Sequence, residues 1–511
     1  MDAIELSLFA SRIAAICDEM GAVLQRTAFS PNIRDRLDFS CAIFDARGEL
    51  CAQAAHIPVH LGSMAYAMAD IVSDINWQAA DMLIVNDPFL GGTHLPDVTL
   101  IAPVFIDAQL IGFVANRAHH ADIGAESPGS MPISTCLQEE GQIISPQKIV
   151  RAGVLDQPFL DKLLTATRGD GAEGRGDLSA QISANHCGVK RLRQLITQMQ
   201  VDIFLDALGH LQSYAERLAS HALEAIPDGV YEFHDYLDDD GVGQQDILIR
   251  VKITVQQQSV HVDFSGTANQ VAGNVNCPLS VAAAGVYYVF RCLMPAQTPA
   301  CAGSFRPISI SAPEGCLLNA RRPAAVAAGN VETSSRLVDM VMGALAKAIP
   351  DKLAAASQGS MNNLAMGGDV NGRCWDYYET IGGGMGASQK HHGLSAVQTH
   401  MTNTLNTPIE VLESRYPLRV RRYAVRQGSG GQGQHRGGDG LIRELEFLQP
   451  ASVTLITERR RHRPWGLQGG GDGEAGQNQL NEKRLPAKTS LTIEVGDRLT
   501  IQTPGGGGWG K

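Results

Sequence analysis

The sequence lacks the features that mark membrane-spanning, secreted and nucleic-acid-binding proteins. It contains no apolar run of about 18 residues, so we expect no transmembrane helix and no membrane partner. Its first residues include Asp2 and Glu5 in place of a basic segment, so we expect no secretory signal and predict a cytoplasmic protein. The net charge of -11 leaves no broad basic surface, which argues against nucleic acid as a partner.

Cysteine is also scarce, with ten in 511 residues, and no two of them form a Cys-x-x-Cys pair. This scatter opposes a zinc ribbon, and a chain of this size does not need a disulfide scaffold, so most cysteines are expected to be reduced and buried. No Gly-x-x-x-x-Gly-Lys-Ser/Thr motif occurs, so the chain shows no nucleotide site of its own. The basic run at 459–463 is expected to be a solvated loop or an ion-pairing surface.

The residues that are present are typical of a large soluble globular protein. Hydrophobic residues make up 44% of the chain and charged residues 19%. The length predicts about two to four lobes with substantial cores. We predict an α+β fold with a mixed α/β region carrying a metal motif at 1–150, a mainly helical segment at 151–228, a central α/β region at 229–420 and a β-rich, glycine-punctuated region at 421–511.

Helical periodicity of the apolar residues is clearest near the N-terminus and after residue 177. The spacing predicts an amphipathic helix over 3–27 with Asp2 as its N-cap. It also predicts a long helical segment from 177 to 225 that is broken near Gly209. Further buried helices are expected at 278–295 and 335–348.

Strand patterns surround the polar motifs and return late in the chain. A strand, a tight turn at 46–48 and a returning strand account for 38–50. Other strands are expected at 82–85, 98–106, 111–115, 247–255, 260–264, 441–447, 452–457 and 490–503. Because polar residues stand at the ends of adjacent core strands before residue 122, we expect them to converge on one pocket.

Glycine, with 54 residues, is concentrated late in the chain. The main clusters are 427–433, 469–473 and 504–510. Their backbone amides could cradle an anion. Alternatively, glycine supplies the positive φ that tight turns need, and we favour this second interpretation.

Two groups of histidine and aspartate within 86–122 carry the clearest chemistry. His94 and Asp97 lie three residues apart, and His119, His120 and Asp122 follow about two dozen residues later. A catalytic divalent metal takes three protein ligands and leaves a position for water or substrate. Two imidazoles and one carboxylate suit Zn²⁺, Mn²⁺ or Fe²⁺. A single buried histidine is more commonly a core residue that donates to a backbone carbonyl, but the grouping favours a metal site with His94, Asp97 and His119 as ligands.

Two later segments are candidates for the same pocket. Residues 379–384 begin a glycine-rich loop, and 400–410 pack a histidine, two asparagines and three threonines into a short span. Such residues could hydrogen-bond a polar substrate or satisfy backbone groups in a buried loop. The sequence leaves these alternatives open.

The motifs together resemble one protein family along essentially the whole chain. The chain resembles the hydantoinase B/oxoprolinase family, which includes the β-type subunit of ATP-dependent N-methylhydantoinases and the related α subunits of acetone and acetophenone carboxylases. The segments that carry the resemblance are 38–41, 57–64, 86–97, 116–122, 127–132, 264–267, 400–404 and 503–508.

The resemblance implies a division of labour between two subunits. An ATP-binding hydantoinase A-type partner would phosphorylate the amide oxygen of a small cyclic amide, and this chain would process the activated species in a hetero-oligomer. The family's metal set of two histidines and one aspartate matches His94, Asp97 and His119. A bound metal would lower the pKa of water toward neutrality, with Asp122 or His120 as orienting groups or proton shuttles. We assign substrate binding to Asp38, His60, Asn86, Asp87 and His400.

Three functions remain open at this point. The first is hydrolysis of a phosphate-activated lactam or hydantoin ring. The second is an α-type subunit of an ATP-dependent ketone carboxylase, although the chain is shorter than those subunits. The third is a non-catalytic scaffold for the ATPase partner. The fused oxoprolinases carry the ATPase half on the same chain, whereas this chain lacks it, so a separate partner is expected.

Overall fold

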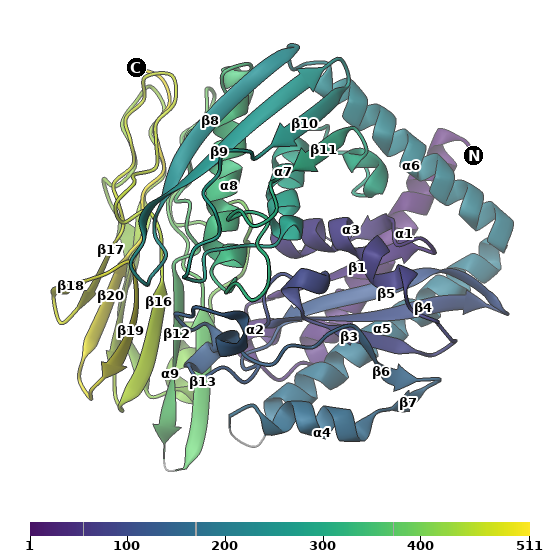
Figure 1. Cartoon of the computed structure of the whole chain (residues 1–511), viewed down its shortest axis with the longest axis horizontal. Helices are drawn as coiled ribbons and strands as arrows, with labels where there is room; N and C mark the ends of the chain where they lie inside the picture. Colours follow the sequence, from purple (N-terminus) through teal and green to yellow (C-terminus); the bar gives the residue numbers. More distant parts are fainter. Residues whose placement is uncertain (55, 169–170, 371) are drawn as a thin grey trace.

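The computed structural model in Figure 1 describes residues 1–54, 56–168, 171–370 and 372–511. Within these ranges helices accompany four sheets, which confirms the α+β fold. The helices are α1 (Ala3–Thr27), α2 (Pro31–Arg34), α3 (Pro58–Ser73), α4 (Gln157–Thr165), α5 (Ala172–Met199), α6 (Val201–Leu223), α7 (Leu279–Leu293), α8 (Ser334–Leu345) and α9 (Ile409–Arg415). The strands are β1 (Phe39–Asp45), β2 (Leu50–Gln53), β3 (Met82–Val85), β4 (Asp97–Ile106), β5 (Gln109–His119), β6 (Gln147–Arg151), β7 (Val154–Leu155), β8 (Gly229–Asp239), β9 (Gln245–Gln256), β10 (Ser259–Asp263), β11 (Ile308–Ser311), β12 (Asn363–Val370), β13 (Arg373–Glu379), β14 (Leu418–Arg426), β15 (Gly440–Phe447), β16 (Ala451–Ile456), β17 (Gln477–Leu480), β18 (Lys483–Leu485), β19 (Lys488–Ile493) and β20 (Arg498–Gln502).

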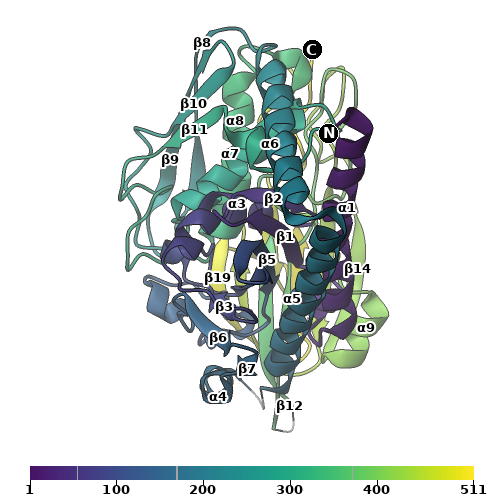
Figure 2. The ribbon, with the colours of Figure 1, turned by 90° about the vertical axis from the view of Figure 1, so that its right-hand side faces the viewer.

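The largest sheet is antiparallel, with the order β2-β1-β5-β4-β3-β6-β7. Successive residues of a strand face opposite sides of a sheet. On one side Cys41 and Val98 pack with α1 and α5, which lie along that face in Figure 2. On the other side Phe44 and Ile101 pack with α3. The predicted strands around the polar motif are therefore confirmed as neighbours in one sheet.

Helix α1 begins where the sequence predicts because its first turn is capped. The Asp2 carboxylate accepts from the backbone N–H groups of Ile4 and Glu5, and the Glu5 side chain accepts in return from the Asp2 N–H. Phe9, Ile13 and the other apolar residues of its inner face are buried, as the periodicity requires.

The long helical segment breaks at Gln200 and not near Gly209, so that prediction was wrong. Gln200 has a φ of 72° and joins α5 to α6, and α5 already begins at Ala172. Gly209 lies inside α6, which continues through it at a cost of about 1 kcal/mol relative to alanine. Neither glycine nor proline marks the break at Gln200, so the sequence pattern could not place it.

The later sheets do not follow the predicted regional boundaries. The sheet β11-β10-β9-β8 packs with α8, but β12 and β13 join a sheet with β16 and β19. The boundary at 420/421 therefore cuts a sheet, and it also falls within β14. The strand expected at 490–503 is two strands in different sheets, β19 and β20. The segment 151–228 is mainly helical, as predicted, and its helix α5 packs on the N-terminal sheet.

The late glycine clusters allow backbones to pack against one another. A Cβ atom on Gly506 would lie 2.1 Å from the Met385 carbonyl oxygen, and one on Gly438 would lie 1.9 Å from the Leu394 oxygen. The N–H of Gly506 donates to the Gly438 carbonyl, so these amides face backbone oxygens and not an anion. Positive φ, which we expected to be the main reason for these glycines, occurs at one position in each cluster: Gly428, Gly469 and Gly510.

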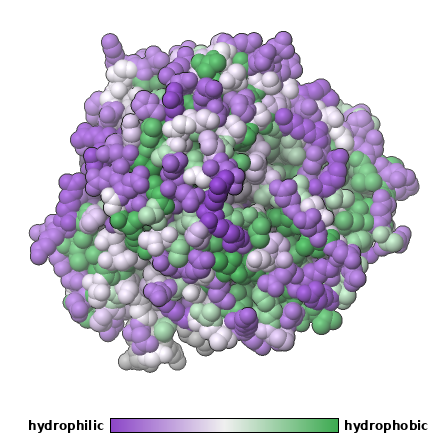
Figure 3. Space-filling model, viewed as in Figure 1, coloured by the Kyte–Doolittle hydropathy of each residue, from purple (hydrophilic) through white to green (hydrophobic). Residues whose placement is uncertain are grey.

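The structure agrees in part with the predictions on membrane helices, cysteines and the basic run. Hydrophilic and hydrophobic residues are interspersed on the face in Figure 3. None of the helices in the described ranges has the length and apolarity needed to cross a bilayer. All ten cysteines are free and six are buried. The basic run is ion-paired, but Arg459 and Arg460 are buried, so the solvated-loop alternative was wrong for them.

Candidate metal centre

The three predicted ligands come together at the paired ends of β4 and β5. Asp97 is the first residue of β4 and His119 the last of β5, and they are direct cross-strand partners. His94 lies in the loop before β4. That loop folds back tightly because Gly91 takes a φ of 102° and Gly92 lies where a Cβ atom would be 2.2 Å from the Asn86 carbonyl oxygen.

Asp97 is the hub of the cluster. Its Oδ2 lies 3.2 Å from His94 Nε2, and its Oδ1 lies 3.2 Å from His119 Nδ1. His60, at the start of α3, places its Nε2 3.2 Å from Asp97 Oδ2. The Thr93 hydroxyl donates to the same oxygen at 2.6 Å. Candidate ligand atoms of His94, Asp97 and His119 all lie within 4.8 Å of one another, close enough to share one ion.

The ring nitrogens show that this cluster suits a cation. His94 Nδ1 lies 3.2 Å from the Ala327 carbonyl, which can only accept, so Nδ1 carries the proton. A neutral His94 therefore turns the lone pair of Nε2 toward the Asp97 carboxylate, an arrangement that a bound cation makes favourable. Among the described residues, His94 Nε2 and His119 Nε2 are buried without a hydrogen-bond partner. These residues fit a divalent metal of the kind that binds imidazole and carboxylate.

At Asp97 and His119 the electrostatics favour the protonation states that metal binding requires, an ionised carboxylate and a neutral imidazole. Burial raises the pKa of Asp97, but the facing histidines outweigh burial and hold that pKa well below its usual range. Burial lowers the pKa of His119. Burial also lowers the pKa of His94, but the charge and hydrogen bond of Asp97, together with the Ala327 carbonyl, outweigh burial and raise that pKa, so a metal ion competes with a proton at His94. An ionised carboxylate beside a neutral imidazole is the state from which a metal site forms without losing a proton from Asp97.

A small buried cavity of about 20 Å³ adjoins the cluster. This is room for about one water molecule. Its polar lining includes Asp38, Asn330, Thr380 and Thr402 beside the histidines. Its apolar lining is Ile57, Val59, Val331, Met361 and Met401.

The predicted substrate-binding residues separate into two groups. Asp38 and His60 line the cavity, with Asp38 Oδ1 3.9 Å from His60 Nε2. Asn86 instead supports the loop, since its amide donates to the carbonyls of Leu95 and Gln142 and accepts from the Ile144 N–H. Asp87 accepts from the Phe89 N–H and pairs with Arg322. Asn86 and Asp87 hold the loop and do not line the cavity, which corrects their assignment.

His120 and Asp122 lie on the other side of the sheet from the cluster. Because side chains alternate along a strand, His120 faces α5, where its Nε2 meets Gln181 Oε1 at 2.9 Å. Asp122 accepts from the Gly124 N–H and the Ser130 hydroxyl. Both line a separate cavity of about 760 Å³. Their predicted role as orienting or proton-transfer groups beside the metal is therefore corrected.

The segments 379–384 and 400–410 both reach the cavity, but through residues adjacent to Glu379 and His400. Thr380, Met401 and Thr402 line it. His400 is buried with a φ of 59°, and its Nε2 lies 2.9 Å from Asp339 Oδ1. Glu379 pairs with Arg443 away from the cavity. The segment 400–410 thus forms one wall of the cavity, and its Asn406 amide donates to the Thr380 carbonyl of the other segment.

Several site residues were missed from the sequence. Thr93 is adjacent to His94 within the motif, so the sequence could have indicated that it supports Asp97. No sequence pattern indicated Asn330 or Tyr378. Asn330 donates to Asp97 Oδ2 at 3.1 Å, and Tyr378 stacks on His119 with ring centroids 4.7 Å apart. Both lie more than two hundred residues from the motif, and only the folded chain brings them to it.

Comparisons with known proteins agree with this architecture. The chain matches the hydantoinase B/oxoprolinase family over residues 2–511. It is 40% identical to 5-oxoprolinase 1 of Arabidopsis thaliana over 550 residues, covering 100% of this chain and 42% of the plant protein. The chain therefore spans less than half the length of that relative.

Two solved structures share the fold. One is an ATP-dependent caprolactamase from Pseudomonas jessenii, with a TM-score of 0.92 and 28% identity over 100% of this chain and 91% of that one. The other is a nucleotide-free acetone carboxylase, with a TM-score of 0.89 and 17% identity over 99% of this chain and 76% of that one. At that identity the second similarity concerns the fold alone.

Proposed function

The chain belongs to the hydantoinase B/oxoprolinase family, and we propose that it is the metal-containing subunit of an ATP-dependent cyclic amidase. It would hydrolyse a lactam or hydantoin ring after phosphoryl transfer to the amide oxygen. The observation that carries this proposal is the buried His94, Asp97 and His119 cluster, whose free ring nitrogens and ionised carboxylate suit one divalent ion such as Zn²⁺, Mn²⁺ or Fe²⁺.

Similarity favours hydrolysis over the alternatives. The plant relative is named a 5-oxoprolinase and the caprolactamase is described as ATP-dependent. Both names concern opening of a cyclic amide. The carboxylase alternative has only the shared fold in its support. A scaffold has no need of a buried cluster that leaves imidazole nitrogens unpaired.

A separate ATP-binding subunit of the hydantoinase A type is part of the proposal. The sequence has no P-loop motif. The plant relative is more than twice as long as the matched region, which leaves room on that polypeptide for a second activity. The caprolactamase chain, of which this chain covers 91%, belongs to an ATP-dependent enzyme without that extra length. We therefore expect a hetero-oligomer with ATP bound on the partner.

The residues of this chain would divide the work as follows. His94, Asp97 and His119 would hold the metal, which supplies Lewis acidity and lowers the pKa of water. Thr93 fixes Asp97, and Tyr378 stacks against His119. The apolar wall around Val331 and Met401 keeps bulk water out, so that an activated amide meets one positioned nucleophile. Water would add to the activated carbon and the ring C–N bond would break, with the nitrogen gaining a proton, which leaves an acyl phosphate. A second water molecule would hydrolyse that acyl phosphate and release inorganic phosphate, so that two water molecules are consumed for each ring opened.

Substrate entry requires the cavity wall to move. A volume of about 20 Å³ admits an ion or a water molecule but not a ring. The segment 399–407 forms one wall without helix or strand, with Met401 and Thr402 inward and Leu405 exposed. Within the described ranges its backbone takes part in no strand pairing. We expect this segment to open when the activated substrate arrives.

The test is an assay of the complete complex. The chain is purified with its ATPase partner and incubated with ATP and 5-oxoproline, hydantoin or caprolactam, and ADP and the ring-opened product are measured. We expect product coupled to ADP without bicarbonate, and loss of both in His94→Ala. Turnover that requires bicarbonate and a ketone would replace this proposal with a carboxylase. Full activity of His94→Ala would leave the chain as a scaffold.

A further inference from the structure

One short segment, 326–333, supports all three candidate metal ligands although it follows them by more than two hundred residues. The Ala327 carbonyl accepts from His94 Nδ1 at 3.2 Å. Asn330 Nδ2 donates to Asp97 Oδ2 at 3.1 Å. The first contact holds His94 by the ring nitrogen opposite Nε2, and the second holds one carboxylate oxygen of Asp97; contacts of this kind orient the ligands of a metal site.

The same segment reaches the third ligand through a chain of contacts. Asn363 Nδ2 donates to Glu332 Oε1 at 2.6 Å, and the Tyr378 hydroxyl donates to Asn363 Oδ1 at 2.7 Å. The Tyr378 ring then stacks on His119 with an angle of 11° between the planes. Glu332 therefore holds the surface against which His119 rests.

The local backbone explains how one segment reaches so many partners. Residues Gly329–Thr333 form a π-helical turn that leads into α8. Such turns widen a helix by one residue per turn and are frequent at functional sites. Gly329 permits it, because a Cβ atom there would lie 1.8 Å from the Asn276 carbonyl oxygen. The Thr333 hydroxyl donates to the Val275 carbonyl and anchors the far end.

The orientation of the Asn330 amide follows from its partner. An ionised carboxylate only accepts, so the amide nitrogen faces Asp97 and Oδ1 points elsewhere. Asn330 is 2% exposed, lines the cavity with His94 and His119, and within the described ranges its Oδ1 has no hydrogen-bond partner. An unpaired buried acceptor costs about 1–3 kcal/mol. Asn330 therefore brings to the cavity lining a buried acceptor, Oδ1, that receives no hydrogen bond from the described residues.

We propose that Asn330 is the positioning residue of the metal centre. Its Nδ2 holds Asp97 in the orientation that receives the ion, and its Oδ1 accepts a hydrogen bond from the water molecule that enters the cavity. The inference rests on the proposed metal site and adds to it a residue that the motif does not contain.

The test uses metal alone, so it does not depend on turnover. The metal-free full chain is titrated with Co²⁺, whose visible absorption reports its coordination. The variant is Asn330→Ala. The matched control is Asn185→Ala on α5, because Asn185 is also fully buried, also has one amide contact, from Asn116 at 2.8 Å, and also has one unpaired polar atom. The control residue does not line the cavity.

We expect Asn330→Ala to weaken Co²⁺ binding by about 10- to 100-fold and to shift the absorption band. Asn185→Ala should leave both unchanged while lowering stability to a similar degree. Equal affinity and an unchanged band in Asn330→Ala would overturn the inference and leave the metal site standing. Equal weakening in both variants would also overturn it. Failure of the unmodified chain to bind Co²⁺ would instead refute the metal site itself.

Two further measurements cover a failure of Asn330→Ala to fold. Asn330→Ser leaves a smaller void and is expected to weaken Co²⁺ binding in the same way, because its hydroxyl is too short to replace the amide. A crystal structure of the unmodified chain with Co²⁺ needs no variant. It should place Asn330 Nδ2 within hydrogen-bond distance of Asp97 and a non-protein donor beside Oδ1. An Asn330 side chain turned away from Asp97 would overturn the inference.

Discussion

Two buried polar clusters in this protein differ in the groups that surround their carboxylates. In the paired cluster, Glu458 accepts from Arg336 at 2.8 Å and from Lys488 at 2.6 Å, and all three side chains are inaccessible to solvent. In the open cluster, the Asp97 carboxylate is surrounded by imidazoles. Within the described ranges each of these keeps one buried ring nitrogen without a hydrogen-bond partner: His60 Nδ1, His94 Nε2 and His119 Nε2.

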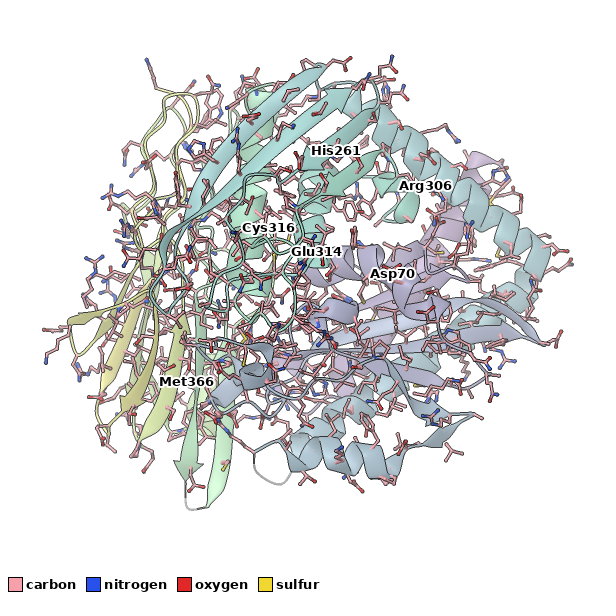
Figure 4. The ribbon with its side chains drawn as sticks, in the orientation of Figure 1. Asp70, His261, Arg306, Glu314, Cys316 and Met366 are labelled. Atoms are coloured by element: carbon pink, nitrogen blue, oxygen red, sulfur yellow. The ribbon has the colours of Figure 1, made fainter. Side chains whose placement is uncertain are left out.

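The difference separates a structural role from a chemical one. Arg336 on α8 also donates to the Tyr236 carbonyl on β8, and Lys488 begins β19, so the paired cluster joins three layers of the fold. Figure 4 shows the interior of the molecule densely filled with side chains, and Met366, labelled there on β12, is fully buried. The paired cluster is complete with protein groups alone, whereas the open cluster becomes complete when a cation enters.

The largest expected effect comes from breaking the paired cluster. Lys488→Ala leaves Glu458 with one cationic partner in a site that is inaccessible to solvent. We expect the free energy of unfolding of the metal-free chain to fall by about 3–5 kcal/mol, measured by denaturant unfolding. Arg191→Ala, which removes an exposed pair with Glu19 of equal length at 2.6 Å, is the control and should have a far smaller effect. Equal losses in both variants would contradict the distinction.

The open cluster should gain stability from an added ion. Zn²⁺ at a hundredfold excess over its Kd should raise the free energy of unfolding by about 2.7 kcal/mol, because the ion binds the folded state. The increment should persist in Lys488→Ala, measured relative to that variant's own metal-free state. His119→Ala should show no increment. An equal gain in His119→Ala would place the ion elsewhere.

A pH-dependent prediction concerns Glu332, which lies between the two clusters. Burial, followed by the charge of Glu458, raises its pKa from 4.5 to about 7. The folded chain therefore holds this proton in a range where the unfolded chain has released it, so stability falls as pH rises through that range. Relative to the unmodified chain, Glu332→Gln should gain about 2 kcal/mol between about pH 4.5 and pH 8. Parallel pH profiles for the two proteins would show that Glu332 is not the cause.

The smallest expected effect comes from a substitution on α6, remote from both clusters, which serves as a baseline. Gly209 lies within α6, and a Cβ atom there would meet nothing within 4 Å. Gly209→Ala should raise the free energy of unfolding by about 0.5–1 kcal/mol without changing metal affinity. Gly285→Ala on α7 is the comparison, since its Cβ would lie 2.8 Å from Leu337 Cδ2 and the gain should disappear. A change in metal affinity in Gly209→Ala would mean that stability alone governs binding.

The parts of the fold set by local pattern could be predicted from the sequence. Helix α1, with its Asp2 cap, and strands β3 to β5 follow from apolar periodicity over a few residues. The break at Gln200 could not be predicted, because an ordinary residue there adopts a rare φ under tertiary constraint. The pairing of β12 with β16 depends on contacts about ninety residues apart, which no local pattern encodes.

The candidate site divides in the same way. His94, Asp97 and His119 could be recognised because the motif gathers ligand-type residues and the strand register makes Asp97 and His119 partners. His120 was misplaced because strand parity, not proximity in sequence, decides which side of the sheet a residue faces. Asn330 could not be found because its π-helical turn is folded against the site from a distant part of the chain.

The central claim is that the open cluster holds one divalent ion, and metal content tests it most directly. The unmodified chain, His94→Ala and His400→Ala are purified alike, and bound metal per chain is measured by elemental mass spectrometry. His400 is the matched control because it is also a buried histidine beside a buried aspartate, 2.9 Å from Asp339. We predict one ion per chain in the unmodified protein and in His400→Ala, and none in His94→Ala. Equal metal in all three proteins, or an unmodified chain without metal in a fully active complex, would contradict the account.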